Sequence, residues 1–549
     1  MSSFSLVATL GQIAVLIILL AAAYVPVGRW MARVYTSPRH LRTEALCYKL
    51  LRINPDAPQT WRGYSRAVLG FSLASVVVLY LIQRLQAVLP SWGNPQEAVE
   101  RAMAFNTAVS FVTNTNWQSY SGEDTLTNFT QAAGLTVQNF LSAAVGMAVA
   151  VALVRGIAYH RNLGNFWVDL VRGTTRILLP GAVIIALLLL AGGVVQSFGS
   201  NLVTAQGVDV PRALIASQEA IKELGTNGGG IVGANSSHPF ENPNGFTNIV
   251  EIFAILVIPV SLTHTYGIMT QRAKDGYTLL GVVVFLWGVV LGLMTWAQVK
   301  AGTIEGIEVR FGQGASALFA TSTTATSTGA VNAMHDSLAP AAGGLAMLNM
   351  LLGEVSPGGV GAGLYGLLVV AIVAVFIGGL LVGRTPEFGG KHVGRREITA
   401  SCLYILVMPT LVLAGTAITV LLPGTIDALT NYGPVGSPAG AHGLSEIIYA
   451  YTSGANNNGS AFGGLTVTNV WFQLSLAAAM ALGRFLPIIC VLMLAGSFSE
   501  QRSTEASSGT LPTHGVTFGA LTVGVVLLVA ALTFFPVLCL GPISEALAA

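Results

Sequence analysis

Charge is scarce in this sequence. Its 549 residues include 26 Lys and Arg and 24 Asp and Glu, so only 9% are charged, whereas soluble domains carry about 25%. A soluble protein of this length needs far more charge to cover its surface, which excludes a large soluble enzyme. The net charge is only +2 and no basic run occurs, which argues against nucleic-acid binding.

Cysteine is rare and catalytic motifs are missing. The sequence has no HExxH, no GxSxG, no phosphate-binding GxxxxGK(S/T), no DKTG phosphorylation site and no paired intramembrane carboxylates. We therefore expect no catalytic site, no organic cofactor and no ATP hydrolysis by this chain. Four cysteines show neither a CxxC motif nor metal-ligand spacing, which predicts buried structural thiols: Cys47, Cys402, Cys490 and Cys539.

Apolar residues dominate instead, at 53% of the chain and a mean hydropathy of +0.68. A bilayer is crossed by about 20 apolar residues in a helix, and ten stretches are long enough. We predict an all-α integral membrane protein with ten transmembrane helices over Leu6–Val27, Ala67–Leu89, Phe129–Val154, Ile177–Phe198, Asn248–Met269, Tyr277–Gln298, Leu364–Val382, Ser401–Leu422, Val470–Leu494 and Val516–Leu540.

Basic residues are concentrated in the even-numbered connections. These hold 19 of the 26: eight from Arg29 to Arg66, four from Arg155 to Arg176, Arg272 and Lys274, four from Arg384 to Arg396, and Arg502. The positive-inside rule makes this face cytoplasmic, so we expect both termini outside a bacterial or archaeal plasma (inner) membrane. No Lys or Arg precedes the first apolar run, which indicates a retained helix rather than a secretory signal.

The odd-numbered connections are long and rich in Asp and Glu. An acidic outer face either concentrates cations near an entrance or is simply solvated, and composition favours neither. Four of these connections share one pattern, a short amphipathic stretch followed by a run of Gly, Asn, Thr and Ser. We expect short helices over 95–112, 211–224, 313–324 and 443–451, the first capped by Asn94 and opened by Pro95, the second begun by Asp209 and Pro211.

The pattern recurs every 101 to 130 residues, centred on Asn116, Gly228, Gly329 and Gly459. It predicts four pseudo-symmetric helix–pore-loop–helix repeats around one central pore, plus one extra helix at each end. The corresponding segments are 1–64 (first helix and basic loop), 65–160, 161–272, 273–385 and 386–500 (the repeats), and 501–549 (last helix).

Such a unit has a specific physical use. A short helix entering from outside points its partly negative C-terminal end towards the membrane centre, and the run after it can present backbone carbonyls. A ring of carbonyls can replace the hydration shell of a monovalent cation. The runs contain no acidic residue, unlike most sites for Ca²⁺ or Mg²⁺. One such run alone is more typical of a surface loop, whereas four at equivalent places favour an ion filter.

Long strings in these regions closely resemble the potassium-binding A subunit of the Kdp-type potassium-transporting ATPase of bacteria and archaea, in the superfamily of K⁺ transporters. The resemblance covers essentially all ten spans. The matching strings are Thr113–Glu123 (TNTNWQSYSGE), Gly225–Gly230 (GTNGGG), Asn235–Pro243 (NSSHPFENP), Gly329–Ser337 (GAVNAMHDS), Gly383–Glu387 (GRTPE) and Asn457–Gly464 (NNGSAFGG).

The resemblance implies a subunit that supplies the ion entrance and the selectivity filter. A separate P-type ATPase subunit, with small accessory membrane subunits, would hydrolyse ATP. K⁺ would bind only at the filter, at Thr113, Asn114, Thr115, Asn116 and Gln118, at Thr226, Asn227, Gly228, Gly229 and Gly230, at Thr326, Ser327, Thr328 and Gly329, and at Asn457, Asn458, Gly459 and Ser460. Gln118 matches a position associated with apparent potassium affinity.

The chain departs from the family at two places. Ile231 and Val232 stand where many relatives have two aromatic residues, and Thr328 stands where many have cysteine. Neither change removes a filter carbonyl, although both alter what packs behind the filter.

Residues 347–363 interrupt the seventh span with an acid, a proline and five glycines. We expect a broken helix that forms a gate below the filter, as in the family, involving Glu354, Pro357, Gly358 and Gly359; a kinked outer loop is the alternative. Arg384 either blocks the pore electrostatically or marks the membrane edge.

Three further residues draw attention. Glu251 and Arg484 lie within spans, where an unpaired charge is costly, and either pair with other groups or line a lateral ion route. His238, next to a proline, is expected to anchor its loop rather than to bind a metal.

Two readings of function remain. The first is the potassium-binding, translocating subunit of an ATP-driven uptake complex, and the second is a stand-alone K⁺ channel or secondary transporter of the same architecture. Accumulation across a ratio of 10⁴ needs about 5.5 kcal/mol, whereas 100 mV supplies about 2.3 kcal/mol. A passive pore therefore cannot collect trace potassium, which favours the first.

Overall fold

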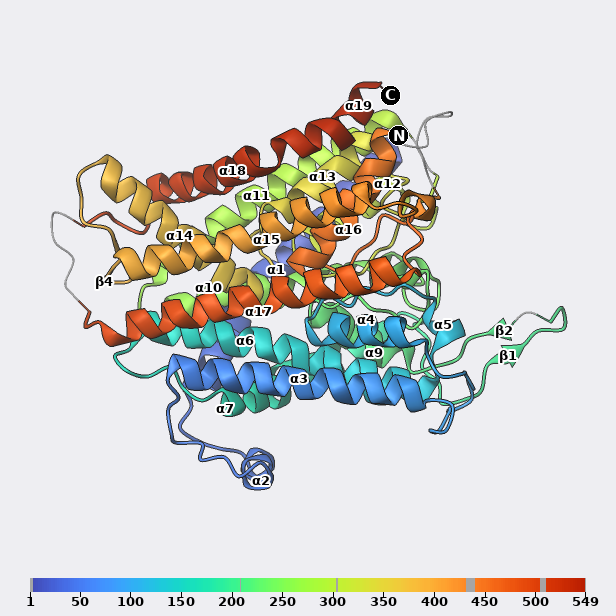
Figure 1. Ribbon diagram of the computed structural model, residues 1–549, viewed down its shortest axis with the longest axis horizontal. Helices are drawn as coiled ribbons and strands as arrows, with labels where there is room; N and C mark the ends of the chain where they lie inside the picture. Colours follow the sequence, from blue (N-terminus) through green and yellow to red (C-terminus); the bar gives the residue numbers. More distant parts are fainter. Residues whose placement is uncertain (1–2, 208, 303–304, 431–439, 504–509, 549) are drawn as a thin grey trace.

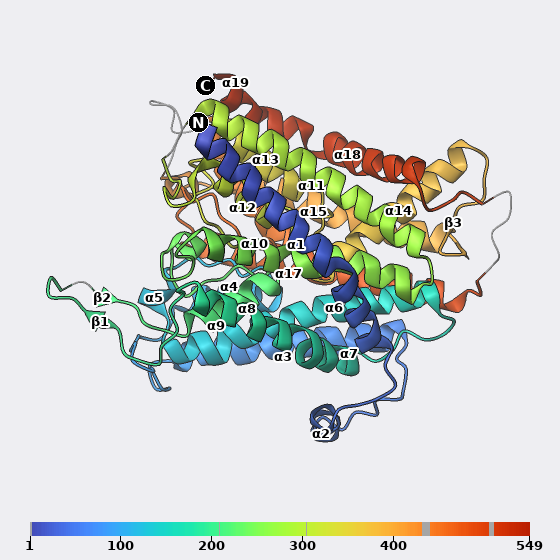
Figure 2. The same ribbon diagram turned by 180° about the vertical axis from the view of Figure 1, so that it is seen from behind.

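Long helices lying side by side along one axis make up most of the molecule (Figures 1 and 2). The computed structural model describes residues 3–207, 209–302, 305–430, 440–503 and 510–548. Within these residues, ten helical segments are long and apolar enough to cross a membrane. The predicted fold class, an all-α membrane protein with ten spans, is confirmed.

The helices extend past the predicted apolar runs at several ends, but the fourth span ends at Ala191 rather than Phe198 and the second at Leu85 rather than Leu89. The spans consist of α1 (Ser3–Thr36), α3 (Trp61–Leu85), η1 (Thr130–Thr136) with α6 (Val137–Ala158), α7 (Phe166–Arg172) with η2 (Gly173–Leu178) and α8 (Leu179–Ala191), α10 (Gly245–Met269), α11 (Ala273–Ala301), α14 (Ala362–Leu381), α15 (Arg395–Leu421), α17 (Val470–Glu500), and α18 (Val516–Leu538) with η5 (Cys539–Ile543) and α19 (Ser544–Ala548).

Four short helices lie between paired spans, as predicted. They are α4 (Arg101–Val112), α9 (Ile215–Leu224), α12 (Gly312–Thr324) and α16 (Ala441–Asn456). The remaining elements are α2 (Arg42–Leu50), α5 (Gly122–Thr125), η3 (Asn235–Ser237), α13 (Pro340–Leu351), η4 (Ile426–Ala428), and two antiparallel hairpins, β1 (Leu202–Val203) with β2 (Asp209–Val210) and β3 (Glu387–Phe388) with β4 (Lys391–His392).

Two predicted helix starts are wrong. Asn94 does not cap α4, because its amide instead donates to the carbonyls of Glu123 and Leu126. The helix begins later, where the Glu100 carboxylate accepts from the Met103 amide at 3.0 Å. Nor does the second short helix begin at Asp209, since that backbone pairs in β2 and α9 starts at Ile215.

The helix after each pore loop is buried, and the helix before it is not. In the most apolar part of the segments containing α6, α10, α14 and α17, 89%, 72%, 72% and 56% of residues are buried. The preceding segments, containing α3, α8, α11 and α15, have 28%, 28%, 39% and 22%. This alternation gives an inner ring of four helices and an outer layer, which is the fourfold pseudo-symmetry expected from the repeats. Helices α1 and α18 lie outside it, with 11% and 28% buried.

The two ends of the molecule hold different elements. Helix α1 begins and α19 ends at the end that holds α4, α5 and the β1–β2 hairpin, while the β3–β4 hairpin lies at the opposite end (Figures 1 and 2).

Polar side chains cap several helices at their first turn: Thr60 accepts from Gly63 N at α3, and Asn469 accepts from Phe472 N at α17.

A buried ion pair joins four helices at the end that carries most basic residues. Arg155 of α6 makes two hydrogen bonds, of 2.6 and 2.9 Å, to the Asp169 carboxylate of α7. Tyr64 of α3 donates to the same carboxylate at 3.0 Å, and Arg155 also donates to the Tyr35 carbonyl of α1 at 2.9 Å. A bidentate, desolvated pair of this kind is costly to break from one side.

We predict that Asp169→Asn lowers the free energy of unfolding by about 3–5 kcal/mol, because it leaves the Arg155 guanidinium buried without a counter-charge. The exposed Arg396–Glu500 pair provides the control, because its atoms are 3.8 Å apart and its side chains are 82% and 65% exposed. Glu500→Gln should change the free energy of unfolding by at most about 1 kcal/mol. Denaturant unfolding in detergent micelles, followed by tryptophan fluorescence, measures both. Equal losses would show that the buried pair does not stabilise the fold.

Candidate functional site

The four runs that follow the short helices meet inside the ring of inner helices. Every predicted filter residue in them is buried except Gln118 and Gly459, which are partly exposed. The runs have no regular secondary structure. Non-helical backbone enclosed in this way, within a membrane protein, needs partners supplied by the protein or by what it binds.

Hydrogen bonds join the four runs in cyclic order, and we call the assembly the filter ring. The four contacts are Asn114 Nδ2 to Thr226 O at 2.6 Å, Gly329 N to Asn227 O at 2.8 Å, Asn458 Nδ2 to Thr326 O at 2.7 Å, and Asn457 Nδ2 to Thr115 Oγ1 at 2.9 Å. First contacts second, second contacts third, third contacts fourth, and fourth contacts first. The structure thus brings all four predicted segments together.

Glycine is required where the runs touch. A Cβ on Gly459, whose φ is 97°, would lie 1.8 Å from the Thr115 carbonyl oxygen. On Gly329 it would lie 2.7 Å from the Gly459 carbonyl carbon, and on Gly228, whose φ is 120°, it would lie 2.2 Å from the Gly329 nitrogen. The backbones therefore approach more closely than any side chain allows.

Three of the four runs carry two left-handed residues, two positions apart. They are Asn114 and Asn116 (φ 68° and 57°), Thr226 and Gly228 (48° and 120°), and Asn457 and Gly459 (60° and 97°). Left-handed backbone is uncommon outside glycine, and such outliers cluster at ligand-binding segments.

Several carbonyls of the ring have no hydrogen-bond donor. Those of Thr115, Ser327, Gly329 and Asn458 accept no hydrogen bond within the described part of the chain, and all four residues are buried. An unpaired buried carbonyl costs free energy, so the ring has the electrostatics of a site for a dehydrated cation.

The segment between α13 and α14 packs directly against the ring. The Glu354 carboxylate accepts from Ser327 Oγ at 2.6 Å and from Asn458 Nδ2 at 2.9 Å, which links it to the third and fourth runs. The Val360 amide donates to Thr226 Oγ1 of the second run at 2.9 Å. Helix α13 and α14 are separate helices, so the span is broken as expected.

The structure brings the predicted gate residues near the ring with one exception. Gly358 donates to the Ala325 carbonyl at 2.9 Å, next to Pro357, and a Cβ on Gly359 would lie 2.6 Å from Ser327 Oγ. Arg384 lies beyond the far end of α14, a helix about 30 Å long, where it is exposed and donates to the Thr510 carbonyl at 3.3 Å.

A cavity of about 100 Å³ adjoins the ring and this segment. Ser327 and Asn457 line it together with Glu354 and Arg484, while apolar side chains of α14, α15 and α18 complete the wall. Arg484 Nη2 donates to the Ser142 carbonyl at 3.4 Å. Arg484 therefore has a partner and also faces the cavity, so both interpretations of this residue remain compatible with its position.

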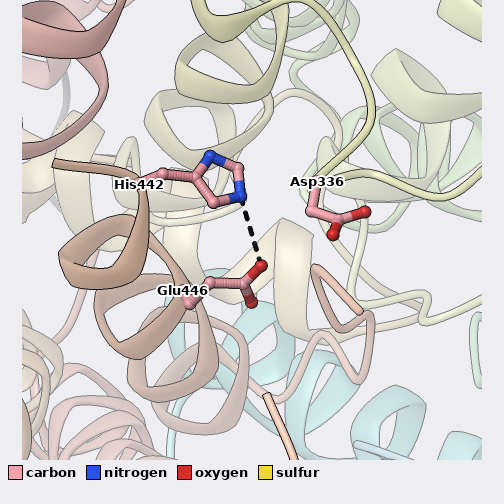
Figure 3. Close-up of side chains that lie close together, drawn as sticks. All are labelled: Asp336, His442 and Glu446. Carbon is pink, nitrogen blue, oxygen red and sulfur yellow. Dashed lines mark ion pairs between the residues drawn. The ribbon is translucent and has the colours of Figure 1, made fainter. Parts of the chain in front are cut away.

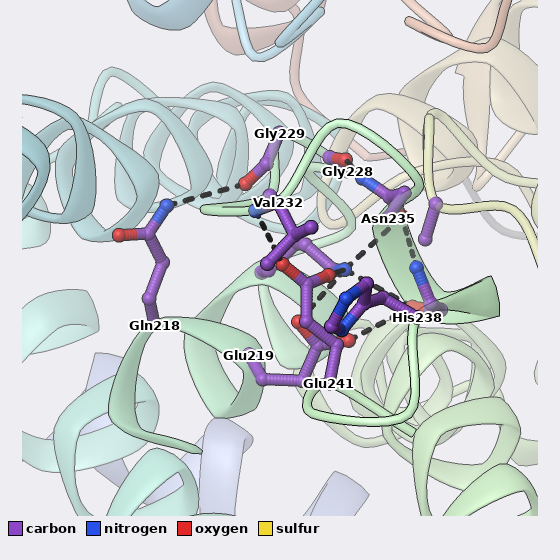
Figure 4. Close-up of polar contacts among 12 residues, drawn as sticks. Gln218, Glu219, Gly228, Gly229, Val232, Asn235, His238 and Glu241 are labelled. Carbon is purple, nitrogen blue, oxygen red and sulfur yellow. Dashed lines mark hydrogen bonds and ion pairs between the residues drawn. The ribbon is translucent and has the colours of Figure 1, made fainter. Parts of the chain in front are cut away.

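A buried ionic network supports the second run, and the sequence did not reveal it. Lys222 Nζ of α9 contacts Glu219 at 2.8 Å, Glu241 at 3.0 Å and Asn235 Oδ1 at 3.1 Å. Figure 4 shows these three partners gathered beside Gly228. Asn235 Nδ2 in turn donates to the Gly228 carbonyl at 2.7 Å. The network fixes the direction of a ring carbonyl. The only hint of this network in the sequence was Lys222 itself, a charged residue within a short helix expected to enter the membrane.

Further contacts tie the same run to its surroundings. Gln218 Nε2 donates to the Gly229 carbonyl at 3.5 Å, and the Val232 amide donates to the Glu241 carboxylate at 2.9 Å (Figure 4). Ile231 and Val232 are both buried in the main apolar core. Aliphatic side chains thus fill the space behind the second run.

Glu251 and His238 lie beside this network. The Glu251 side chain is fully buried, and its carboxylate lies within 4.8 Å of those of Glu219 and Glu223. Burial lowers the pKa of His238, and its Nδ1 accepts from the Phe240 amide at 3.1 Å. By this hydrogen bond His238 anchors its own loop, as predicted.

Gln118 clamps the first run to the second. Its Nε2 donates to the Gly230 carbonyl at 3.1 Å, and its Oε1 accepts from the Gly230 amide at 3.0 Å. One side-chain amide thus pairs with both groups of one residue, at the partly exposed margin of the ring.

Comparisons with known proteins agree over nearly the whole chain. Residues 14–547 match the family described as "Potassium-transporting ATPase A subunit". Proteins named "Potassium-transporting ATPase potassium-binding subunit" are 60% identical in Nocardia farcinica and 53% identical in Streptomyces coelicolor, each alignment covering 98% of both chains. The solved potassium transporter TrkH from Vibrio parahaemolyticus shares the fold, with a TM-score of 0.55 at 14% identity, covering 91% of this chain and 100% of that one.

We predict that Gly459→Ala destabilises the protein by at least about 2–3 kcal/mol, because its methyl group would overlap the Thr115 carbonyl. Gly302 serves as the control, since its backbone is left-handed (φ 70°, ψ 6°) and no atom of the described residues lies within 4 Å of its Cβ position. Gly302→Ala should cost only about 1 kcal/mol, from the backbone conformation alone. Denaturant unfolding in detergent separates the two; equal losses would mean that the runs do not touch at Gly459.

Proposed function

Because this chain belongs to the family of potassium-transporting ATPase A subunits, we propose that it is the potassium-binding and translocating subunit of an ATP-driven, high-affinity potassium uptake complex. It takes K⁺ from outside the cell through the filter ring and passes it to a P-type ATPase subunit. The observation that carries this proposal is the closed ring of four runs, in which several buried carbonyls accept no hydrogen bond from any residue that the structure describes.

The ring's chemistry suits a monovalent cation. Its groups are backbone carbonyls, hydroxyls and amides, and none of its residues is acidic. Neutral oxygens can replace the water of K⁺, whereas Ca²⁺ and Mg²⁺ usually require carboxylates. We propose as K⁺-binding residues Thr113–Asn116 and Gln118, Thr226–Gly230, Thr326–Gly329, and Asn457–Ser460.

We further propose that the segment from Glu354 to Gly359 gates the inner side of the ring. The Glu354 carboxylate accepts hydrogen bonds from Ser327 and Asn458 at 2.6 and 2.9 Å. Movement of the segment would therefore change the positions of the third and fourth runs. Arg384 lies apart from it, which supports a role at the membrane edge rather than in the same gate.

ATP hydrolysis in this scheme belongs to a partner. The sequence contains neither a nucleotide-binding nor a phosphorylation motif, and uptake against a steep gradient needs an energy source. We propose a P-type ATPase subunit and small accessory membrane subunits as partners, in a bacterial or archaeal plasma membrane. The basic connections would face the cytoplasm and both termini would lie outside.

The test of this function is potassium-stimulated ATPase activity. We expect the purified chain to hydrolyse no ATP, and the complex that co-purifies with it from the source cell to hydrolyse ATP in proportion to K⁺ occupancy. Proteoliposomes holding the chain alone provide the counter-test. If the isolated chain conducts K⁺ selectively and no ATPase subunit co-purifies, the stand-alone channel or transporter is the correct function.

We predict that Gln118→Arg raises the K⁺ concentration needed for half-maximal ATPase activity at least about tenfold, equivalent to about 1.4 kcal/mol. Arginine cannot accept the Gly230 amide hydrogen bond, and its charge repels K⁺ at the ring. Gln196→Arg is the matched control, because Gln196 is exposed and its amide bonds to Ser217 away from the ring. The same shift in both variants would count against a role of Gln118 in ion binding.

A further inference from the structure

Three side chains from distant parts of the sequence converge outside the filter ring. Asp336 lies between α12 and α13, whereas His442 and Glu446 lie one turn apart at the start of α16 (Figure 3). One ligand atom from each lies within 4.8 Å of the other two. Sequence spacing could not reveal the group, because Asp336 is separated from the others by most of a repeat.

The imidazole of His442 is held in a fixed orientation. Its Nδ1 hydrogen-bonds to the Glu545 carboxylate of α19 at 2.7 Å, and the Phe462 ring stacks against it at 6.1 Å and 16°. These contacts turn Nε2 towards Glu446 (Figure 3). A carboxylate that holds one imidazole nitrogen while the other faces a ligand set is the usual arrangement around a metal-bound histidine.

The facing atoms of His442 and Glu446 make no hydrogen bond within the described part of the chain. His442 Nε2 and both carboxylate oxygens of Glu446 have no hydrogen-bond partner among the described residues. The exposed fractions of His442 and Glu446 are 5% and 1%. A buried carboxylate without a hydrogen bond is expensive, so a positive charge is expected beside it, either an imidazolium on His442 or a bound cation.

The distance between Nε2 and Glu446 Oε1 is 3.5 Å. That is too long for a good N–H···O hydrogen bond, which measures about 2.7–3.2 Å. Two ligands bound tetrahedrally to Zn²⁺ at about 2.0–2.1 Å are about 3.3–3.4 Å apart. The gap therefore matches the spacing of two ligands on one metal ion.

We propose that Asp336, His442 and Glu446 form a binding site for Zn²⁺ or a chemically similar divalent transition-metal ion, with Glu545 orienting the histidine. One imidazole and two carboxylates suit such an ion. K⁺ does not favour an imidazole ligand, and Ca²⁺ and Mg²⁺ prefer sites made only of oxygen. The site is distinct from the filter ring and does not depend on the proposed function.

The bound ion would join three parts of the chain. It would connect the segment before α13, the start of α16 and, through His442, α19. Tyr449 lies one turn after Glu446 on α16, and its hydroxyl is 2.8 Å from both Ser460 Oγ and His335 Nδ1. A metal at the start of α16 would therefore stiffen the helix that positions the fourth run of the ring.

The competing occupant is a proton on Nε2. Burial lowers the pKa of His442, but the neighbouring carboxylates of Glu446 and Glu545 raise it to about 10. An imidazolium would balance part of the carboxylate charge without a metal. The two occupants differ in metal content and in ligand geometry, which makes them separable.

The test uses the full chain purified with the subunits that accompany it. After chelator treatment and dialysis, ZnCl₂ is added, excess is removed on a desalting column, and metal per chain is measured by inductively coupled plasma mass spectrometry. We expect one Zn²⁺ per chain and a higher thermal midpoint. His442→Gln and Glu446→Gln should lose that equivalent, whereas His238→Gln, a histidine of another loop, should retain it.

A fourth variant guards against misfolding. Glu545→Gln keeps the three proposed ligands but weakens the orientation of the imidazole, so it should bind Zn²⁺ about 10–100-fold more weakly. Zinc-edge X-ray absorption of the loaded protein should show one imidazole and oxygen ligands. Less than a tenth of an equivalent in the parent protein, or an equivalent retained in His442→Gln, would overturn the proposal in favour of the proton.

Discussion

Backbone that is neither helix nor sheet, buried within a membrane protein, has to find partners for its amide and carbonyl groups, and this structure is organised around that need. Four such runs enter between pairs of spanning helices. Asparagine side chains and backbone amides of neighbouring runs satisfy part of the requirement and close the runs into a ring. The carbonyls left over are those that a dehydrated cation would satisfy. Structural need and proposed function therefore concern the same atoms.

The four runs have similar shapes but different supports. The second is held by the Lys222 network, and the third and fourth by the Glu354 carboxylate. The first is held by polar side chains of α6, with Asn116 Nδ2 donating to Asn139 Oδ1 at 2.6 Å. Buried charged side chains thus lie behind the ring and not within it. From there they can fix the direction of the carbonyls without competing with them for the ion.

Much of this could be predicted from the sequence. Ten apolar runs, the distribution of basic residues and four polar runs at regular intervals led to the fold class and to the four segments that meet. Helix starts were less predictable: at Asn94 and Asp209, residues typical of helix caps bond elsewhere because tertiary contacts outweigh local preference. The Lys222 network and the Asp336–His442–Glu446 group were beyond prediction, because each joins residues whose proximity depends on how the repeats pack.

Encoding the ring in one chain has a consequence for how its properties can change. In a channel made of four identical subunits, a single codon change alters all four walls of the filter at once. Here the third run has no left-handed residue among its described positions, while the other three have two each. Because each run has its own codons, each can be altered separately, and a substitution in one run perturbs only about a quarter of the ion's surroundings. Evolution can adjust such a filter in small steps that fourfold symmetry forbids.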